Sequence, residues 1–394
     1  MSGSPLLPIF LIVLVDVLGL SIIIPLLPFY AEHFGASATV VGTLVSSFAF
    51  CQLIAGPILG KLSDRMGRKP LLIVSQIGTC IGFLILAGAQ SLWMVFLSRI
   101  IDGATAGNLS LAQAYIADVT KPEERTKSFA VIGIAFGIGF LIGPALSGWL
   151  SHYSYTYPIL VAAALSAGSV ICTATLLPSV EPHTLNQSGP GGKRLGVLDW
   201  RTYGQYFTRP ELGPLLLQFF FFAFSFSMFV NGFALFSERR FTWHGKPFDA
   251  MQVGFILAWV GFLSIILQGG LIGKLVKRFG ELSLVRSGFL VTAVTSFWLA
   301  RVDSIGELLA NTGVSSYGSG VVRPAVTALI TQKASKQEQG VVLGLTQSLT
   351  SVSAIIAPVV AGALIDRGWL AAWAIGVGLV ALCGMIAAYR YKPA

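Results

Sequence analysis

The sequence predicts an all-α membrane protein with twelve transmembrane helices arranged as two pseudo-symmetric six-helix bundles. Of the 394 residues, 54% are hydrophobic and only 11% are charged, whereas a soluble domain usually carries about 25% charged residues. Long uncharged runs recur along the whole chain, and a membrane helix needs roughly 20 mostly apolar residues. Short motifs also repeat between the two halves, which indicates that a six-helix unit was duplicated.

The apolar runs define twelve predicted spans. In the first half these are 8–31, 38–60, 70–90, 92–117, 128–151 and 155–178. In the second half they are 212–236, 249–272, 283–300, 304–331, 339–365 and 369–390. Residues 179–211 are rich in proline, glycine and polar side chains, which is typical of a linker. We therefore expect an N-terminal bundle (1–178), a cytoplasmic linker (179–211) and a C-terminal bundle (212–394).

The cations predict the orientation of the chain. Most of the 26 lysines and arginines lie in segments on the same side of the membrane as the amino terminus. Because positive loops stay inside, both termini are expected in the cytoplasm. The net charge of +9 does not indicate nucleic-acid binding, since the cations form no basic face interleaved with aromatic residues. The histidines have no metal spacing, and a phosphate-binding loop and a Ser–His–Asp set are absent from the sequence, so we expect neither an enzyme nor ATP drive.

Two motifs repeat at nearly the same offset. "GKLSDRMG" from Gly60 is echoed by "GKLVKRFG" from Gly273, and "GPALSG" from Gly143 is echoed by "APVVAG" from Ala357. Parallel repeats of this kind are one standard plan for secondary transporters.

Charged residues inside predicted spans are candidates for proton coupling, because a charge at that depth costs roughly 2.5–3.5 kcal/mol and marks ion pathways. Asp16 lies well inside the first span. Arg99 and Asp102 are three residues apart and share a helix face, and helical spacing extends this polar stripe to Gln113. The pair either takes part in coupling or forms a static brace. Glu307 and Arg323 lie in the tenth span, where each either acts on proton or substrate or extends to the nearer surface.

Uncharged polar side chains inside spans are candidates for contact with substrate, since they favour a watery cavity over lipid. Together with Arg323 we assign substrate binding to Gln113, Gln218, Asn231, Asn311 and Gln347.

Two glycine-containing motifs are candidates for conformational control. At the end of the second span, a latch set consists of Gly60, Asp64, Arg65, Gly67 and Arg68. A carboxylate there can accept from the free N–H groups at the start of another helix; the alternative is that the cations only hold the loop inside.

The fifth span carries small residues that allow close backbone approach, together with a proline that invites a bend. They suit either a rocking helix or ordinary tight packing, and they are Gly133, Gly137, Gly143, Pro144 and Gly148.

These motifs resemble those of major facilitator superfamily transporters, within the drug/proton antiporter group and closest to the tetracycline efflux proteins. The resemblance rests on "GKLSDRMGRKP", "DVLGLSIIIPLLP", "SRIIDGATAGNLSLAQAYIADVTKPEER", "GIAFGIGFLIGPALSG" and "LFSERRFTW". It covers nearly the whole chain and implies that Asp64 caps the eleventh span near Gly340. The chain departs from tetracycline exporters in the third and ninth spans, where Gly82 and Thr292 stand at the positions of acids.

The resemblance and the charges together predict a proton-coupled antiporter that exports an amphipathic organic compound, neutral or anionic. Alternatives are an organic-anion importer or exchanger, and a membrane receptor or scaffold without flux. The expected partners are the organic substrate, protons and membrane lipids, with no other cofactor and no metal. We expect a monomer in a bacterial inner membrane.

Overall fold

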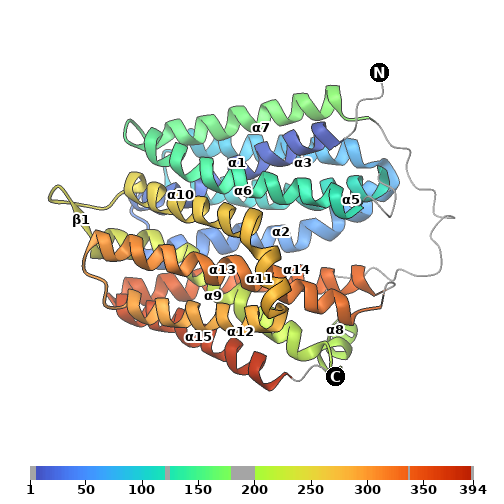
Figure 1. Cartoon of the computed structure of the whole chain (residues 1–394). Coiled ribbons are helices and arrows are strands. Elements are labelled where there is room, and N and C mark those ends of the chain that lie inside the picture. The colour runs from blue at the N-terminus through green and yellow to red at the C-terminus, as the bar shows by residue number, and fades with distance from the viewer. Residues whose placement is uncertain (1–5, 120–124, 179–199, 336–337, 392–394) are drawn as a thin grey trace. The chain divides into compact units, whose positions relative to one another are not determined.

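The computed structural model describes residues 6–119, 125–178, 200–335 and 338–391, and these residues are almost entirely helical (Figure 1). The helices of the first half are α1 (Leu6–His33), α2 (Ala38–Met66), α3 (Arg68–Ala87), α4 (Leu92–Thr105), α5 (Asn108–Val119), α6 (Arg125–Ser151) and α7 (Thr156–Leu176). Those that follow are α8 (Trp200–Phe207), α9 (Gly213–Arg240), α10 (Ala250–Ile266), α11 (Ile272–Phe279), α12 (Glu281–Leu299), α13 (Ile305–Lys333), α14 (Gln339–Asp366) and α15 (Leu370–Arg390). A π-helical turn, Leu267–Leu271, joins α10 to α11.

Ten helices of the described residues are long and apolar enough to cross a membrane. The predicted spans 92–117 and 304–331 are outside this set for different reasons. The first is divided into α4 and α5, each shorter than a membrane crossing. The second is α13, which has 29 residues but many polar ones. With these two counted, the helices follow the twelve predicted spans.

The break between α4 and α5 is stabilised by a serine from a neighbouring helix. The hydroxyl of Ser75 on α3 donates to the carbonyl of Thr105 at 2.5 Å and accepts from the N–H of Gly107 at 2.9 Å. Backbone groups freed at helix ends need such partners. The straight polar stripe expected from Arg99 to Gln113 is therefore interrupted.

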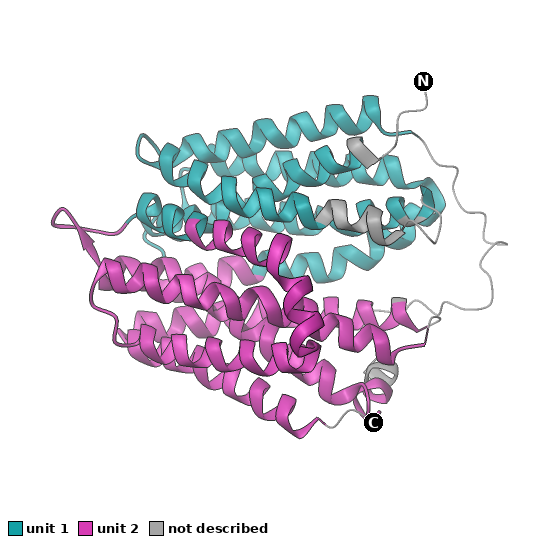
Figure 2. Cartoon of the chain, viewed as in Figure 1, with its two compact units in different colours: residues 1–36, 47–187, 249–258 teal, residues 37–46, 188–248, 259–394 magenta. Residues whose placement is uncertain are grey.

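The helices form two compact units (Figure 2). Unit 1 contains residues 1–36, 47–187 and 249–258, and unit 2 contains residues 37–46, 188–248 and 259–394. The first part of α2 therefore belongs to unit 2, and the first part of α10 belongs to unit 1. In unit 1, α1 packs against α6 and α7, and α3 packs against α4 and α7. In unit 2, α9 packs against α14 and α15, and α12 packs against α13 and α15.

Equivalent turns follow the two repeated motifs. Gly67 ends the α2–α3 turn with φ 95°, and Gly280 ends the α11–α12 turn with φ 75°. Glycine adopts such positive φ values without a steric penalty, which explains why both copies of the motif end in glycine. A two-residue hairpin between α9 and α10, β1 (Thr242–Trp243) and β2 (Lys246–Pro247), was not predicted; it turns through His244 and Gly245, both with positive φ.

Candidate transport site

A buried charge pair lies inside unit 1. Arg99 and Asp102 are adjacent on one face of α4, with Nη1 3.2 Å from Oδ2, and each residue is about 5% exposed. The guanidinium also lies 5.6 Å from the centroid of the Phe83 ring. Its Nη2 is buried without a hydrogen-bond partner among the described residues. Asp102 therefore balances the charge of Arg99 and leaves one donor of that arginine available.

Gly82 allows Asp102 to occupy this position. A Cβ at Gly82 would stand 3.0 Å from the Cβ of Asp102 and 3.1 Å from the carbonyl of Ser98. The family resemblance places an acidic residue at this position of the third span. In this chain the position is Gly82, and Asp102 of α4 packs against it. A side chain at Gly82 would require Asp102 or Ser98 to move by a few tenths of an ångström.

Asp16, on α1, is half-buried and is contacted from α7. The hydroxyl of Ser169 donates to Oδ1 of Asp16 at 3.4 Å, and the amide of Gln76 on α3 donates to the same hydroxyl at 2.8 Å. Sequence reasoning missed Ser169 and Gln76. The available signal was polar spacing on two predicted spans, but it did not show which face of each helix meets Asp16.

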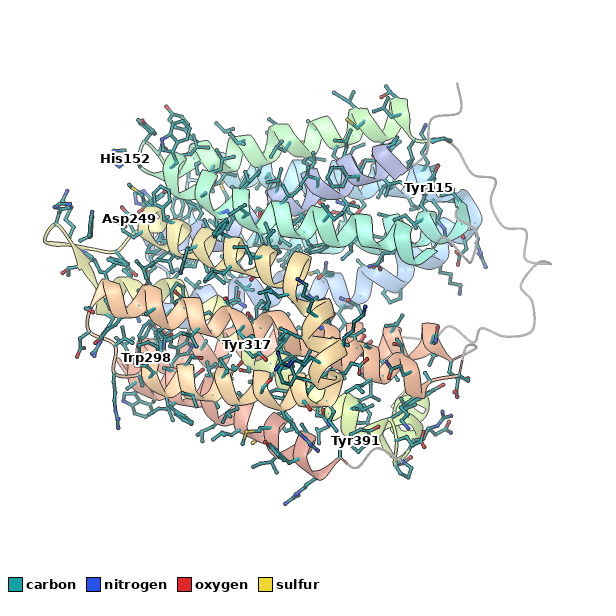
Figure 3. All side chains as sticks on the ribbon, in the orientation of Figure 1. Tyr115, His152, Asp249, Trp298, Tyr317 and Tyr391 are labelled. Carbon is teal, nitrogen blue, oxygen red and sulfur yellow. The ribbon has the colours of Figure 1, made fainter. Side chains whose placement is uncertain are left out.

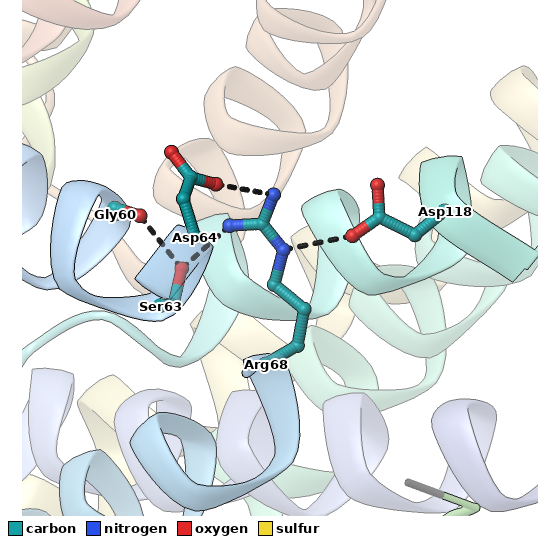
Figure 4. Close-up of polar contacts among 5 residues, drawn as sticks. All are labelled: Gly60, Ser63, Asp64, Arg68 and Asp118. Atoms are coloured by element: carbon teal, nitrogen blue, oxygen red, sulfur yellow. Dashed lines mark hydrogen bonds and ion pairs between the residues drawn. The ribbon is translucent and has the colours of Figure 1, made fainter. Parts of the chain in front are cut away.

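Arg68 is the centre of the latch motif (Figure 4). Its side chain is 5% exposed and contacts Oδ1 of Asp64 at 2.6 Å and Oδ2 of Asp118 at 2.8 Å. It also donates to the hydroxyl of Ser63 at 2.5 Å, and that hydroxyl donates to the carbonyl of Gly60 at 2.7 Å. A buried arginine needs such compensation. Asp118 was not predicted as a site residue, although it lies within one of the motifs that carry the resemblance.

The remaining residues of the latch set are Gly67 and Arg65. Gly67 forms the turn before Arg68, as described above. Arg65 is exposed, and the neighbouring Lys69 donates to the carbonyl of Ala174 at 2.8 Å. The capping of the eleventh span by Asp64 stays a prediction.

A second carboxylate, Asp366 at the end of α14, caps the start of α2. It accepts from the N–H groups of Ala38 at 2.7 Å and Thr39 at 2.9 Å. It also accepts from the hydroxyls of Ser37 at 2.8 Å and Thr39 at 2.5 Å. Sequence reasoning missed Asp366, because the contact joins residues more than 300 positions apart.

Below this cap the two helices touch through glycine. A Cβ at Gly42 would collide with the carbonyl of Pro358, and one at Gly362 would collide with the carbonyl of Ala38. The hydroxyl of Ser46 donates to the carbonyl of Ile355 at 2.5 Å. We call this contact, from Ser37 to Ser46 on α2 and from Ile355 to Asp366 on α14, the α2–α14 seam; all of it lies in unit 2.

The predicted antiporter motif of α6 makes the matching contact with α10 in unit 1. A Cβ at Gly254 would collide with the carbonyl of Pro144, and one at Gly148 would stand 2.8 Å from the carbonyl of Met251. Asp249, at the start of α10, caps that helix itself through the N–H of Met251 at 2.7 Å. Figure 3 labels Asp249 and His152, which directly follows α6. Both seams are therefore close contacts made through glycine. The start of α2 is capped by Asp366 of α14, whereas the start of α10 is capped by Asp249 of its own segment.

The other glycines of the motif differ in their surroundings. Gly143 packs against Ser21 of α1, whose hydroxyl donates to the carbonyl of Gly139 at 2.8 Å. Gly133 has no atom within 4 Å of a built Cβ. Gly137 lies in α6 between them.

Three predicted substrate residues of unit 2 bond within their own bundle. Asn311 is buried on α13 and donates to the carbonyl of Thr295 on α12 at 2.8 Å. Gln218 is buried on α9 and donates to the carbonyl of Ala387 at 3.4 Å. Asn231 donates to the carbonyl of Ser227, one turn earlier, at 2.8 Å. These contacts give all three side chains a packing role.

Glu307 has a local role at the start of α13. Its N–H donates to the hydroxyl of Ser304 at 3.2 Å, and its carboxylate accepts from the N–H of Asp303 at 3.3 Å. Ser304 caps α13 as in a capping box, while the carboxylate of Glu307 accepts from the residue before the cap, so the geometry favours a structural role over the predicted proton coupling.

The last three predicted substrate residues are exposed on their helices: Gln113, Arg323 and Gln347. Arg323 has no ion-pair partner within the part of the chain that the structure describes. Among all residues that the structure describes, no group of three or more His, Cys, Asp or Glu side chains could hold a metal ion.

Membrane-length helices in two compact units, with a buried charge pair in one of them, define a polytopic membrane protein. The sequence comparison places it in a family. The family model described as Major Facilitator Superfamily matches residues 9–300 and 248–394, and the chain therefore belongs to the Major Facilitator Superfamily.

Drug-resistance proteins are among the relatives of the chain. The chain is 31% identical to "Tetracycline resistance protein, class B" of Escherichia coli over 376 residues, which cover 93% of this chain and 90% of that protein. It is 28% identical to "Multidrug resistance protein 2" of Bacillus subtilis (strain 168), with 91% and 89% covered. The chain is thus a Major Facilitator transporter related to tetracycline and multidrug efflux proteins.

Solved structures of transporters share the fold. The human organic anion transporter MFSD10 (TETRAN) matches with a TM-score of 0.74 at 22% identity, covering 98% of this chain and 100% of that chain. The nucleoside transporter NupG matches with a TM-score of 0.76 at 16% identity, covering 99% and 100%.

Proposed function

We propose that the chain is a proton-coupled antiporter that exports an amphipathic organic compound, neutral or anionic, by alternating access. The observation that carries this proposal is the group Asp16, Arg99 and Asp102 inside unit 1. An arginine does not release its proton, so Asp102 balances it and Asp16 remains as the acid whose protonation changes the charge of the group. Antiport requires that proton and substrate do not occupy the carrier together, so that one is released before the other crosses.

The charge of this group bears on the class of substrate. Arg99 and Asp102 together are neutral, and Asp16 adds one negative charge when it is ionised. The available Nη2 of Arg99 is a hydrogen-bond donor, which a neutral polar or anionic head group can use and a permanent cation cannot. Gly82 and Thr292 add no acid to oppose this preference.

A second candidate is an importer or exchanger of organic anions. It is favoured by the same unpartnered Nη2 of Arg99, because an anion that binds beside it together with a proton on Asp16 would move in the same direction as the proton. The two candidates therefore predict opposite signs of proton movement for one outward substrate gradient.

The test uses the full chain in liposomes that contain a pH-sensitive dye. Three probes are loaded in turn: tetracycline, an anionic dye and a quaternary ammonium dye of similar size. Antiport predicts protons moving inward as the anionic or neutral probe leaves, and Asp16→Asn abolishes the signal while the protein remains folded. Protons that leave with the probe support the second candidate. Export of the quaternary ammonium dye, with no competition from the anionic dye, overturns the proposal that the substrate is neutral or anionic. A folded protein that moves none of the three probes supports the alternative of a membrane receptor or scaffold without flux.

The chain is a multi-pass membrane protein, and its bacterial relatives point to the cell membrane. The finer topology belongs to the proposal: both termini lie in the cytoplasm, residues 179–211 connect the bundles 1–178 and 212–394, and the α2–α14 and α6–α10 seams lie at the outer side.

A further inference from the structure

Three polar side chains of α7 are turned into the protein. Ser166, Ser169 and Thr173 follow one another at helical spacing and are at most 3% exposed, whereas Leu160 and Ile171 are exposed. A membrane helix with this pattern keeps its apolar residues toward lipid and its polar residues toward other protein. Here the buried face of α7 packs against α1 and α3.

This face joins three helices through one directed set of hydrogen bonds. Gln76 of α3 donates through Nε2 to the hydroxyl of Ser169, which in turn donates to the carboxylate of Asp16 on α1. The hydroxyl of Ser166 donates to the backbone carbonyl of Gln76 at 3.2 Å. Ser169 is therefore held from one side by Gln76 and contacts Asp16 on the other.

Two oxygen atoms along this face have no protein partner. Oε1 of Gln76 and Oγ1 of Thr173 are buried and form no hydrogen bond with any of the described residues. Leaving a buried polar atom unsatisfied is unfavourable, and in folded proteins ordered water commonly supplies the missing partner. Ser169 and Thr173 are one helical turn apart, about 6 Å along the axis, a separation that a chain of one or two water molecules can span.

We propose that Ser169 and Gln76 position the carboxyl group of Asp16, and that water held at Gln76 and Thr173 carries its proton along α7 toward the end of that helix. The inference rests on the proposed function, in which Asp16 is the proton carrier. When Asp16 is protonated, the hydroxyl of Ser169 turns from the carboxyl group to the water at Thr173, and the O–H of Asp16 donates to the lone pair of Ser169 that this turn frees. The O–H bond of Asp16 then breaks as its proton passes to Ser169, and Ser169 releases its own proton to that water. Asp16 is left as a carboxylate, Ser169 keeps one O–H bond, and the water carries the extra proton onward.

Few charged groups oppose or replace this route. α7 has no charged side chain, and the charged residues of α6, Arg125 and Lys127, lie in its first turn. The other helices packed against α1 and α3 contribute Arg99 and Asp102 from α4 and Asp118 from α5, and α3 itself begins with Arg68 and Lys69. In the proposed topology α7 ends on the cytoplasmic side, where an antiporter releases its proton.

The test compares the same substitution on two faces of α7. Thr173→Val removes the buried hydroxyl, and Thr175→Val removes an exposed one that donates only to the carbonyl of Ile171. In liposomes with tetracycline as the probe (or whichever of the three probes the parent chain moves), we expect Thr173→Val and Ser169→Ala to slow pH-driven transport by about tenfold or more. Exchange of the probe without a pH gradient stays at the rate of the parent. Thr173→Ser restores the hydroxyl and restores the rate.

The outcomes separate this inference from the proposed function. If Asp16→Asn abolishes pH-driven transport but Thr173→Val behaves like Thr175→Val, the proton route is wrong and the carrier stands. If Asp16→Asn transports like the parent, the proposed function itself fails. If Thr173→Val slows pH-driven transport and exchange equally, the hydroxyl has only a structural role and the route is also wrong. Size-exclusion chromatography identifies variants that do not fold; if Ser169→Ala is one of them, the three threonine variants decide.

Discussion

Asp366→Asn tests whether the α2–α14 seam acts as a gate at the proposed outer side. The substitution keeps the shape of the side chain and removes its charge. Asp366 accepts two backbone N–H bonds and two hydroxyl bonds at the start of α2. The first N–H groups of a helix have no partner inside that helix, so opening the seam breaks all four bonds and leaves these groups to water.

The size of the effect follows from the type of contact. Loss of a helix cap costs about 0.5–2 kcal/mol, and the interaction of a charge with a helix start contributes about 0.3–1 kcal/mol. Asparagine keeps part of the cap, and the exposed position of Asp366 weakens its charge through solvent screening. We therefore expect a change of about 1 kcal/mol, which corresponds to roughly a fivefold rise in the population with the seam open.

The assay reports the opening through Ser46, which is 7% exposed in the seam. A cysteine is placed there by Ser46→Cys, with the four native cysteines replaced by alanine, and its labelling by an impermeant maleimide is timed. Asp366→Asn is expected to raise the labelling rate about fivefold. The matched control is Asp303→Asn, since Asp303 is exposed and pairs with Arg240. Equal rates in the two variants would show that Asp366 does not hold the seam closed.

Three further predictions concern stability. Gly42→Ala forces a methyl group against the carbonyl of Pro358 and should destabilise the protein by about 1–3 kcal/mol. The control Gly56→Ala has open space around its Cβ and should leave the melting temperature unchanged or higher. Equal shifts in melting temperature for the two variants would refute the seam contact. Asp118→Asn should destabilise by about 1–3 kcal/mol, measured by thermal unfolding in detergent, because Arg68 loses a charged acceptor. The hydrogen bond from Arg209 lowers the pKa of Glu338, so this pair stabilises the folded state above the unfolded carboxyl pKa of about 4.3 and ceases to do so as the pH falls through the lower folded value. The melting-temperature difference between the parent and Arg209→Ala should therefore shrink in acid, and a difference independent of pH would contradict the pairing.

Most helices could be predicted from the sequence, because uncharged runs of membrane length have few alternatives to a helix. The break within the predicted span 92–117 could not, since it depends on Ser75 of α3 satisfying Thr105 and Gly107. A pattern along one segment does not report a hydrogen bond supplied by another. The stripe that was expected to continue from Arg99 to Gln113 therefore ends at Thr105.

The same distinction applies to the site. The pair Arg99 and Asp102 was predictable from its spacing on one helix. The contacts of Asp16 with Ser169 and of Asp366 with α2 join distant segments, and only the fold brings them together. Glu307 is the reverse case. Its charge within a polar predicted span suggested coupling, yet its hydrogen bonds are to Ser304 and Asp303 at the start of α13.

The assignment of the first part of α2 to unit 2, and of the first part of α10 to unit 1, has a consequence for how the protein is made. Gly42 is synthesised and inserted long before Pro358, so its packing surface stays uncovered while most of the chain is still being translated. Contacts this distant in sequence form slowly and late, and the seam is therefore expected to close as a final step of assembly in the membrane. Each half also carries a helical segment that packs on the other half. If the two halves are produced as separate chains, divided within residues 179–199, we expect them to associate in the membrane. Residues 37–46 of the first half and 249–258 of the second each pack on helices of the other half.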